Sequence, residues 1–329
     1  MSQTEENSIE KRKRIFSLDI FKGLTVILMV YANTLNPYEN VPAWSKHAGD
    51  YGLTFVDVIA PLFVFMVALS MNVAYKKRLL KIGRKKTILR YLRRFFIFIG
   101  LGLGLTLYIS PEEFYLRWGT FQVLGVSGLF LLLIIEFKPF IKLSFAGIFM
   151  ILHQIILLTP LNTVVYNSLE GGVTGVFSWA SMMILSSFLA TGLNKHNNLA
   201  RKYLLYGGLI SLIIGILVSP LLEISRPFIS VPYILISVGV ASITYYFLYY
   251  IFEESGYKLD FLRKEKVLSV VGKNAFILYL LHVLFAYMIY LIVPIDAPFI
   301  LILSLSFAHI FLIWLIAFFM NKVEMFIVI

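Results

Sequence analysis

Long apolar runs separated by short polar segments occupy almost the whole chain. A helix that crosses a bilayer needs about 20 mostly apolar residues. Ten segments meet this requirement, at roughly 16–36, 52–75, 90–110, 117–136, 140–160, 174–193, 201–221, 229–251, 267–292 and 298–320. The pattern predicts an all-α fold, a polytopic membrane helix bundle of about ten transmembrane helices.

The chain divides into a short polar tail and one apolar domain. Residues 1–14 are polar and predict a cytoplasmic tail, whereas residues 15–329 predict a single transmembrane domain. No small-residue cleavage site follows the first apolar run, which itself contains Asp19 and Lys22. We therefore expect a retained span and not a cleaved signal peptide.

Basic residues set the expected orientation, because cytoplasmic segments of membrane proteins are rich in Lys and Arg. With the N-terminus inside, 25 of the 29 Lys and Arg fall in inside segments, and only Lys46, Arg117 and Arg226 fall in outside loops. Both termini are thus predicted to be cytoplasmic. The net charge of +11 is then a topology signal, and no nucleic-acid partner is expected.

The amino-acid composition is typical of a membrane protein and excludes chemistry that depends on cysteine. The chain is 59% hydrophobic and 14% charged, whereas a soluble domain has about a quarter charged residues. Membrane lipid is therefore an expected partner. Cysteine is absent, which excludes thiolate metal sites and a cysteinyl acyl intermediate. No two histidines have the i,i+4 spacing of a helical metal site, and no metal is expected.

Polar residues inside the first predicted hairpin are the main candidates for chemistry, since intramembrane ionisable groups are costly and usually functional. At 100° per residue, Lys22 lies about 60° and Asn33 about 40° from Asp19 around the helix, so the three share one face. Asp19 and Lys22 belong near the cytoplasmic end and Asn33 near the outer end. The structural alternatives are an i,i+3 ion pair for the first two and a helix cap for Asn33.

A histidine and an acid follow at the same outer end. His47 lies in the loop after the first span, and Asp57 lies one to two turns into the second. A histidine can act as a general base near neutral pH while a carboxylate orients its ring. The structural alternative is a surface histidine and a loop-supporting Asp57. We expect Asn33, His47 and Asp57 to converge at one depth.

Several motifs resemble one known family, the heparan-alpha-glucosaminide N-acetyltransferases. The strongest similarity lies in the first 70 residues, and weaker matches follow along most of the chain. The matching stretches are Ser17–Thr25, Val30–Asn33, Lys46–Ala48, Gly52–Asp57, Pro61–Phe65, the set Arg117, Gly119 and Gln122, Gly175–Trp179, and Gly272–Ala275. The chain differs in having Lys22 where arginine is more usual. It looks like a short prokaryotic-type member without a large lumenal domain.

The resemblance implies a multi-pass acetyltransferase (EC 2.3.1 class) of the plasma (inner) membrane. Such a protein moves an acetyl group from cytoplasmic acetyl-CoA, its co-substrate, to an amine or hydroxyl of a sugar or cell-envelope glycan outside. His47 and Asn33 would then be catalytic, with Asp57 as the orienting acid. We expect Arg117, Gln122, Asp19 and Lys22 to contribute to acetyl-CoA binding, and a homodimer is left open.

Two other functional classes fit parts of the pattern. In an ion- or proton-coupled transporter of a small solute, Asp19, Lys22 and Asp57 would form a relay, but no inverted repeat or pair of broken helices is visible. A noncatalytic membrane scaffold would bind no CoA and would tolerate substitution of the hairpin residues.

Overall fold

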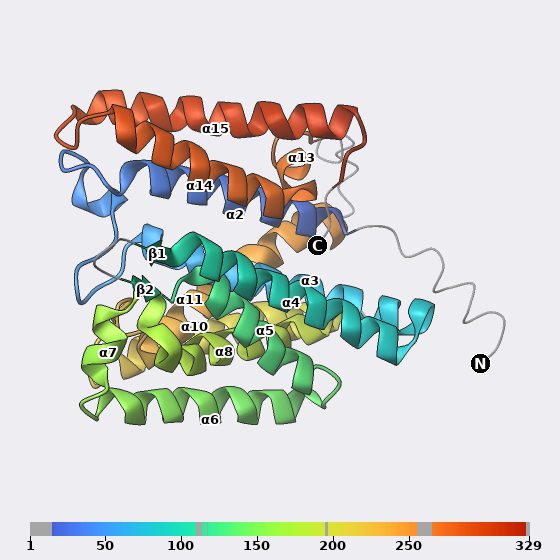
Figure 1. Cartoon of the computed structure of the whole chain (residues 1–329). Helices are drawn as coiled ribbons and strands as arrows, with labels where there is room; N and C mark the ends of the chain where they lie inside the picture. Colours follow the sequence, from blue (N-terminus) through green and yellow to red (C-terminus); the bar gives the residue numbers. More distant parts are fainter. Residues whose placement is uncertain (1–14, 110–113, 117, 195–196, 255–264, 327–329) are drawn as a thin grey trace.

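The protein folds as a bundle of long helices (Figure 1). The computed structural model describes residues 15–109, 114–116, 118–194, 197–254 and 265–326. The longer helices are α2 (Phe16–Leu35), α3 (Phe55–Ile82), α4 (Arg84–Thr106), α5 (Thr120–Ile134), α6 (Pro139–Leu157), α8 (Gly172–Leu189), α10 (Gly207–Val218), α11 (Val231–Tyr249), α14 (Ala275–Ile292) and α15 (Phe299–Lys322).

Short elements connect the long helices. They are the helices α7 (Asn162–Asn167), α9 (Asn197–Ala200) and α13 (Leu268–Lys273), the 3-10 turns η1 (Ala43–Ser45), η2 (Leu169–Gly171) and η3 (Ala190–Asn194), the π-helical turns η4 (Arg201–Tyr206) and η5 (Tyr250–Glu254), and the strands β1 (Leu107–Ile109) and β2 (Phe114–Leu116). The two strands form one antiparallel pair. The predicted 1–14 tail lies outside the described residues.

The all-α membrane bundle is confirmed. Eight helical stretches of the described residues are long and apolar enough to cross a membrane. Of the remaining long helices, α5 is apolar but has only 15 residues, and α4 begins with a strongly basic half. Each of the ten apolar segments therefore contains a helix, while the figure of about ten spans stays a prediction.

Two predicted boundaries differ from the structure. Residues 76–89, which separate the predicted spans 52–75 and 90–110, are helical except at Gly83, whose φ of 78° ends α3. A positive φ is readily adopted by glycine, which has no Cβ. The predicted segment 267–292 is broken at Asn274, so that α13 and α14 are separate helices. Both differences arise because polarity alone does not show where a helix bends.

The inner helices position the candidate site. Four-fifths of the apolar window of α3 is buried (83%), against 17% for α6, so α3 is central while α6 is largely exposed. Figure 1 shows α6 and α15 at opposite edges of the bundle. The α2 and α13 helices cross in close contact, since a Cβ on either Gly23 or Gly272 would meet backbone atoms of the other helix.

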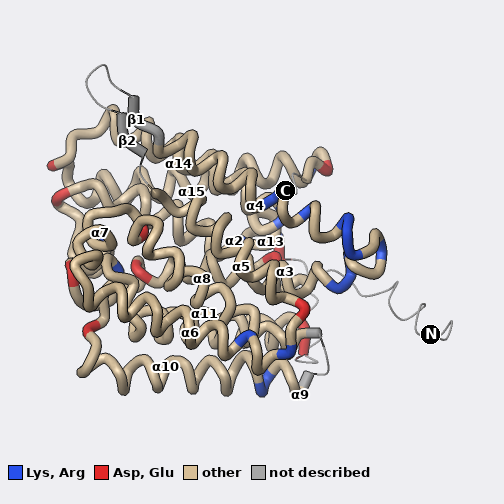
Figure 2. The backbone as a smooth tube through the Cα atoms, turned by 60° about the horizontal axis from the view of Figure 1, so that its bottom comes forward, with Lys and Arg blue, Asp and Glu red and all other residues tan. Residues whose placement is uncertain are grey.

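Charge is unevenly distributed between the two ends of the bundle. Figure 2 shows most of the described Lys and Arg near the end where α3 and α4 meet. That end would face the cytoplasm if positive charge stays inside. The cytoplasmic position of the termini remains a prediction.

Candidate active site

His47 and Asp57 form a hydrogen-bonded pair in the structure. The His47 Nδ1 atom lies 2.7 Å from Asp57 Oδ1. The Asp57 side chain is fully buried, whereas the His47 side chain is 30% exposed. With Nδ1–H donating to the carboxylate, the neutral ring carries its lone pair on Nε2. The exposed imidazole can thus accept a proton while a buried acid fixes its orientation.

The carboxylate of Asp57 is held by the start of its own helix. Its Oδ2 accepts from Ala48 N at 3.1 Å and Thr54 N at 2.8 Å, and Thr54 Oγ1 lies 3.0 Å away. Thr54 and Asp57 form a capping box at the N-terminus of α3, an arrangement that satisfies backbone donors left free at a helix start. Both oxygens of Asp57 are therefore engaged, and the acid has one orientation.

Pro61 leaves the backbone carbonyl of Asp57 without its usual helical partner. Proline has no N–H to donate to the carbonyl four residues earlier. The Tyr233 hydroxyl from α11 donates to this carbonyl instead, at 2.9 Å. Since Tyr233 is fully buried, this contact ties the first turns of α3 to the core.

The loop that carries His47 is fastened to a distant loop, residues 219–230. Gly52 N donates to Ile224 O at 2.8 Å, and Ser225 Oγ donates to Asp50 O at 2.6 Å. Tyr166 of α7 donates to the Asp50 carboxylate at 2.7 Å. The loop that carries His47 is therefore held in position by hydrogen bonds to two other segments.

A second charged pair lies beside the dyad. Arg226 Nη2 contacts Glu170 Oε1 at 3.1 Å, with side-chain exposures of 24% and 12%. Burial disfavours the charged form of Arg226, but the attraction of Glu170 and of nearby Tyr233 and Asp57 outweighs it and raises the Arg226 pKa. The Arg226 Nε atom has no hydrogen-bond partner among the described residues. A cationic donor thus lies close to the buried acid.

Asn33 lies at the same end of the bundle and contacts a different histidine. Its Nδ2 atom is 2.9 Å from Nε2 of His282, on α14. Asn33 is exposed, whereas His282 is fully buried. Tyr31 Oη and Ser45 Oγ, each two residues before Asn33 and His47 respectively, are 3.0 Å apart. This contact brings α2 against the His47 loop, but Asn33, two residues after Tyr31, points to nearly the opposite side of the helix. The structure thus pairs His47 with Asp57 and pairs Asn33 with His282.

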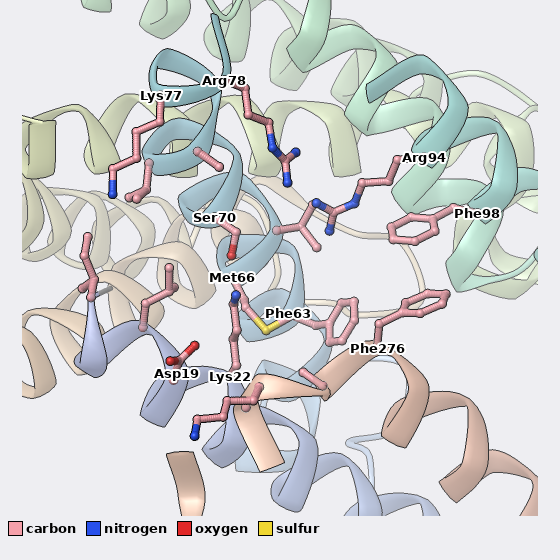
Figure 3. Close-up of a pocket in the computed structure, with 18 residues that line it drawn as sticks. Asp19, Lys22, Phe63, Met66, Ser70, Lys77, Arg78, Arg94, Phe98 and Phe276 are labelled. Carbon is pink, nitrogen blue, oxygen red and sulfur yellow. The ribbon is translucent and has the colours of Figure 1, made fainter. Parts of the chain in front are cut away.

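At the other end of α2, Asp19 and Lys22 line a cavity of about 450 Å³ (Figure 3). Phe63, Met66 and Phe276 contribute apolar walls. Basic side chains from four elements also border it, namely Lys22, Lys77, Arg78, Arg94 and Lys273. Asp19 is the one acid among the lining residues that the structure describes. We call this cavity the basic pocket.

Arg94 makes the basic pocket a candidate anion-binding site. Figure 3 shows Arg94 and Arg78 extending into the pocket from α4 and α3. The buried Nε of Arg94 has no hydrogen-bond partner among the described residues. An unsatisfied buried donor is costly, and an anionic group placed here would satisfy it.

Comparison with known proteins decides the family. The profile described as "Heparan-alpha-glucosaminide N-acetyltransferase, catalytic" matches residues 14–202, more than half of the chain. The chain belongs to this acetyltransferase family. No curated protein matches the chain significantly. Together with its apolar helices, the match makes the protein a multi-pass membrane member of a transferase family.

The family match covers Asn33, His47 and Asp57 but ends before Arg226, Lys273 and His282. Arg226 was expected only to mark the orientation of the chain, and His282 lies in a predicted apolar span. His282 bonds to another helix, and no sequence spacing shows that its partner is Asn33, 249 residues away. The basic charge was expected to signal topology, yet Lys77, Arg78 and Arg94 line the basic pocket.

Gln122 and Arg117, which were expected to contribute to acetyl-CoA binding, are not found among the described lining of the basic pocket. Gln122 is fully buried at the start of α5, where its side chain accepts from Gly119 N at 3.0 Å and donates to Thr106 Oγ1 at 2.8 Å. It does not line the basic pocket. Arg117 lies outside the described residues. Roles for both in acetyl-CoA binding stay predictions.

The described part of the acetyltransferase offers no obvious place for a metal ion. No three His, Asp or Glu side chains gather there at distances that suit a metal ion. The prediction that no metal is needed remains untested by this finding.

Proposed function

We propose that the protein transfers an acetyl group from cytoplasmic acetyl-CoA to an amine or hydroxyl of a sugar or cell-envelope glycan on the outer side. The observation that carries the proposal is the His47–Asp57 pair, in which a buried carboxylate orients an accessible imidazole at 2.7 Å. Acyl transfer needs a base for the proton of the attacking group. His47 Nε2 supplies that base.

The basic pocket suits acetyl-CoA. The coenzyme combines anionic phosphates with a largely uncharged arm, and the pocket combines five cations with apolar walls. Lys22, Arg78 and Arg94 would bind phosphate oxygens, because guanidinium and ammonium groups form strong charge-assisted hydrogen bonds with them. We propose Lys22 in the role expected for it, with Arg94 as the strongest added candidate.

An extended coenzyme is long enough to reach from the basic pocket to the end of the bundle that holds Asn33 and His47. Lys22 and Asn33 are 11 residues apart on α2, which is about 16 Å of axial rise. Phosphates held at the basic pocket would leave the thioester free to point toward Asn33 and His47. Direct transfer is therefore the simplest scheme, and an acetyl-His47 intermediate is the alternative.

In direct transfer, the acceptor nitrogen or oxygen forms a bond to the acetyl carbonyl carbon and the carbon–sulfur bond breaks. The acceptor proton passes to His47 Nε2 and then to the departing thiolate, which leaves as the free thiol of CoA. Asp57 stabilises the transient imidazolium through the Nδ1 hydrogen bond. Arg226, close to Asp57, adds positive potential where negative charge develops on the carbonyl oxygen.

The test is acetyl-CoA turnover by purified protein with glucosamine as the first acceptor. His47→Ala and Asn33→Ala should each lose activity, by about 10²–10⁴-fold for the base. Lys46→Ala is the matched control, since the half-buried Lys46 side chain donates to the Glu39 carbonyl and has no hydrogen bond to His47, Asn33 or Asp57 in the described structure. Wild-type rates in both variants would contradict the site assignment.

A further inference from the structure

His282 is buried in the bundle and is hydrogen-bonded through both ring nitrogens. Its Nδ1 contacts the backbone carbonyl of Tyr279, one turn earlier on α14. Its Nε2 contacts Asn33 Nδ2 at 2.9 Å. The ring also packs on Tyr279, with centroids 4.9 Å apart. Its position is therefore fixed on two sides.

These contacts determine where the hydrogens lie. A backbone carbonyl can only accept, so His282 Nδ1 must carry the proton that it shares with Tyr279. A buried imidazole without a carboxylate partner is held neutral by the cost of burying charge. The remaining nitrogen, Nε2, is then an acceptor. Asn33 must therefore present its NH₂ group, and not its oxygen, to His282.

The orientation of the Asn33 amide follows from this. Its oxygen and nitrogen lie on opposite branches of a planar group, so the branch turned away from buried His282 carries Oδ1. Asn33 is exposed at that point. We propose that His282 is a positioning residue that holds Asn33 Oδ1 toward the acceptor, where it accepts a hydrogen bond from the amine or hydroxyl that attacks. The proposal rests on the proposed function.

The neighbouring histidine provides a matched control. His309, on α15, is also buried and stacks on His282 with a centroid distance of 6.4 Å. Its Nδ1 contacts Thr34 Oγ1 at 2.9 Å, and Thr34 donates to the Val30 carbonyl. His309 therefore joins α15 to α2 at the same depth without contacting Asn33.

The experiment is a double-mutant cycle of His282→Phe and Asn33→Leu, with kinetics measured separately for acceptor and acetyl-CoA. His282→Phe should lower kcat/KM for glucosamine roughly tenfold to hundredfold, the range for loss of a hydrogen bond that positions a reacting group, and leave the KM for acetyl-CoA unchanged. In the Asn33→Leu background it should have almost no further effect, because coupled residues are not additive. His282→Gln, whose amide oxygen can accept from Asn33, should restore part of the rate.

Additive losses, or an equal effect of His309→Phe on the acceptor, would overturn the proposal and indicate a merely structural His282. If His282→Phe does not fold, Asn33→Asp decides the question, because aspartate keeps an oxygen toward the acceptor while His282 takes up a proton to bind it. Asn33→Asp should then be clearly more active than Asn33→Leu, and equal rates would contradict the proposal. If the wild type transfers no acetyl group, the proposed function fails, and glucosamine binding by the same variants, measured by calorimetry, decides the role of His282.

Discussion

At the residue scale, the site is defined by how completely its buried acid is satisfied. Asp57 accepts from His47 through one oxygen and from Ala48 and Thr54 through the other. The pairing of His47 with Asp57 could be predicted from the sequence, because the two residues are ten positions apart, in the loop before the second span and at the start of that span. It did not predict the partner of Asn33, since hydrogen bonds between distant helices leave no local pattern.

Asp57→Asn should reduce turnover by about 10²–10⁴-fold, the usual range for loss of acid–base function. An asparagine must either turn its NH₂ toward His47, which forces the wrong tautomer, or turn it toward the donors of Ala48 and Thr54. Measurement of kcat with saturating acetyl-CoA checks this. Asp50→Asn, in the same loop but bonded to Tyr166, is the control and should remain near the wild-type rate. Wild-type activity of Asp57→Asn would show that Asp57 is not needed to orient His47.

Arg94→Gln should raise the KM for acetyl-CoA roughly tenfold to hundredfold, since a hydrogen bond to a charged group contributes about 1.5–3 kcal/mol. The reason is the loss of a buried donor that faces the basic pocket. Arg93→Gln is the matched control, because Arg93 is exposed on the same helix and does not line the pocket. Equal KM values for the two variants would place the coenzyme elsewhere.

At the scale of elements, the crossing of α2 with α13 positions one wall of the basic pocket. Gly23 and Gly272 each lie against the backbone of the other helix, and Asp19, Lys22 and Lys273 line the pocket beside this crossing. Hydropathy predicted both helical segments but merged α13 with α14. It did not separate them at Asn274, because Lys273 and Asn274 are too short a polar interruption to end an apolar window of about 20 residues.

Gly23→Ala should destabilise the protein by about 1–3 kcal/mol, the usual cost of overpacking. A Cβ at this position would overlap the carbonyl of Leu268, and backbone cannot move aside as a side chain can. Thermal unfolding in detergent, followed by size-exclusion chromatography, measures the effect. Gly147→Ala in α6, where no heavy atom lies within 4 Å of the added Cβ, should be neutral or slightly stabilising. An unchanged melting temperature for Gly23→Ala would show that the two helices are not in close contact.

At the scale of the whole molecule, two chemically different sites lie at opposite ends of one helical bundle. Asp19 and Lys22 border the basic pocket, while Asn33, His47 and Asp57 lie at the other end. The lengths of the apolar segments and the distribution of Lys and Arg along the chain were enough to predict the bundle. They were also enough to assign these residues to two opposite ends. The pocket itself was not predictable, because its cations come from α2, α3, α4 and α13 and meet only through tertiary packing.

The most direct test of this account is the sidedness of acetyl transfer in proteoliposomes of uniform orientation. Labelled acetyl-CoA is supplied on the side of the basic pocket, and glucosamine is enclosed on the side of His47. We predict that acetylated glucosamine accumulates in the glucosamine compartment with the wild type and not with His47→Ala. Transfer across the membrane would be contradicted if product formed only with both substrates on the same side. The role of His47 would be contradicted if His47→Ala formed as much product as the wild type.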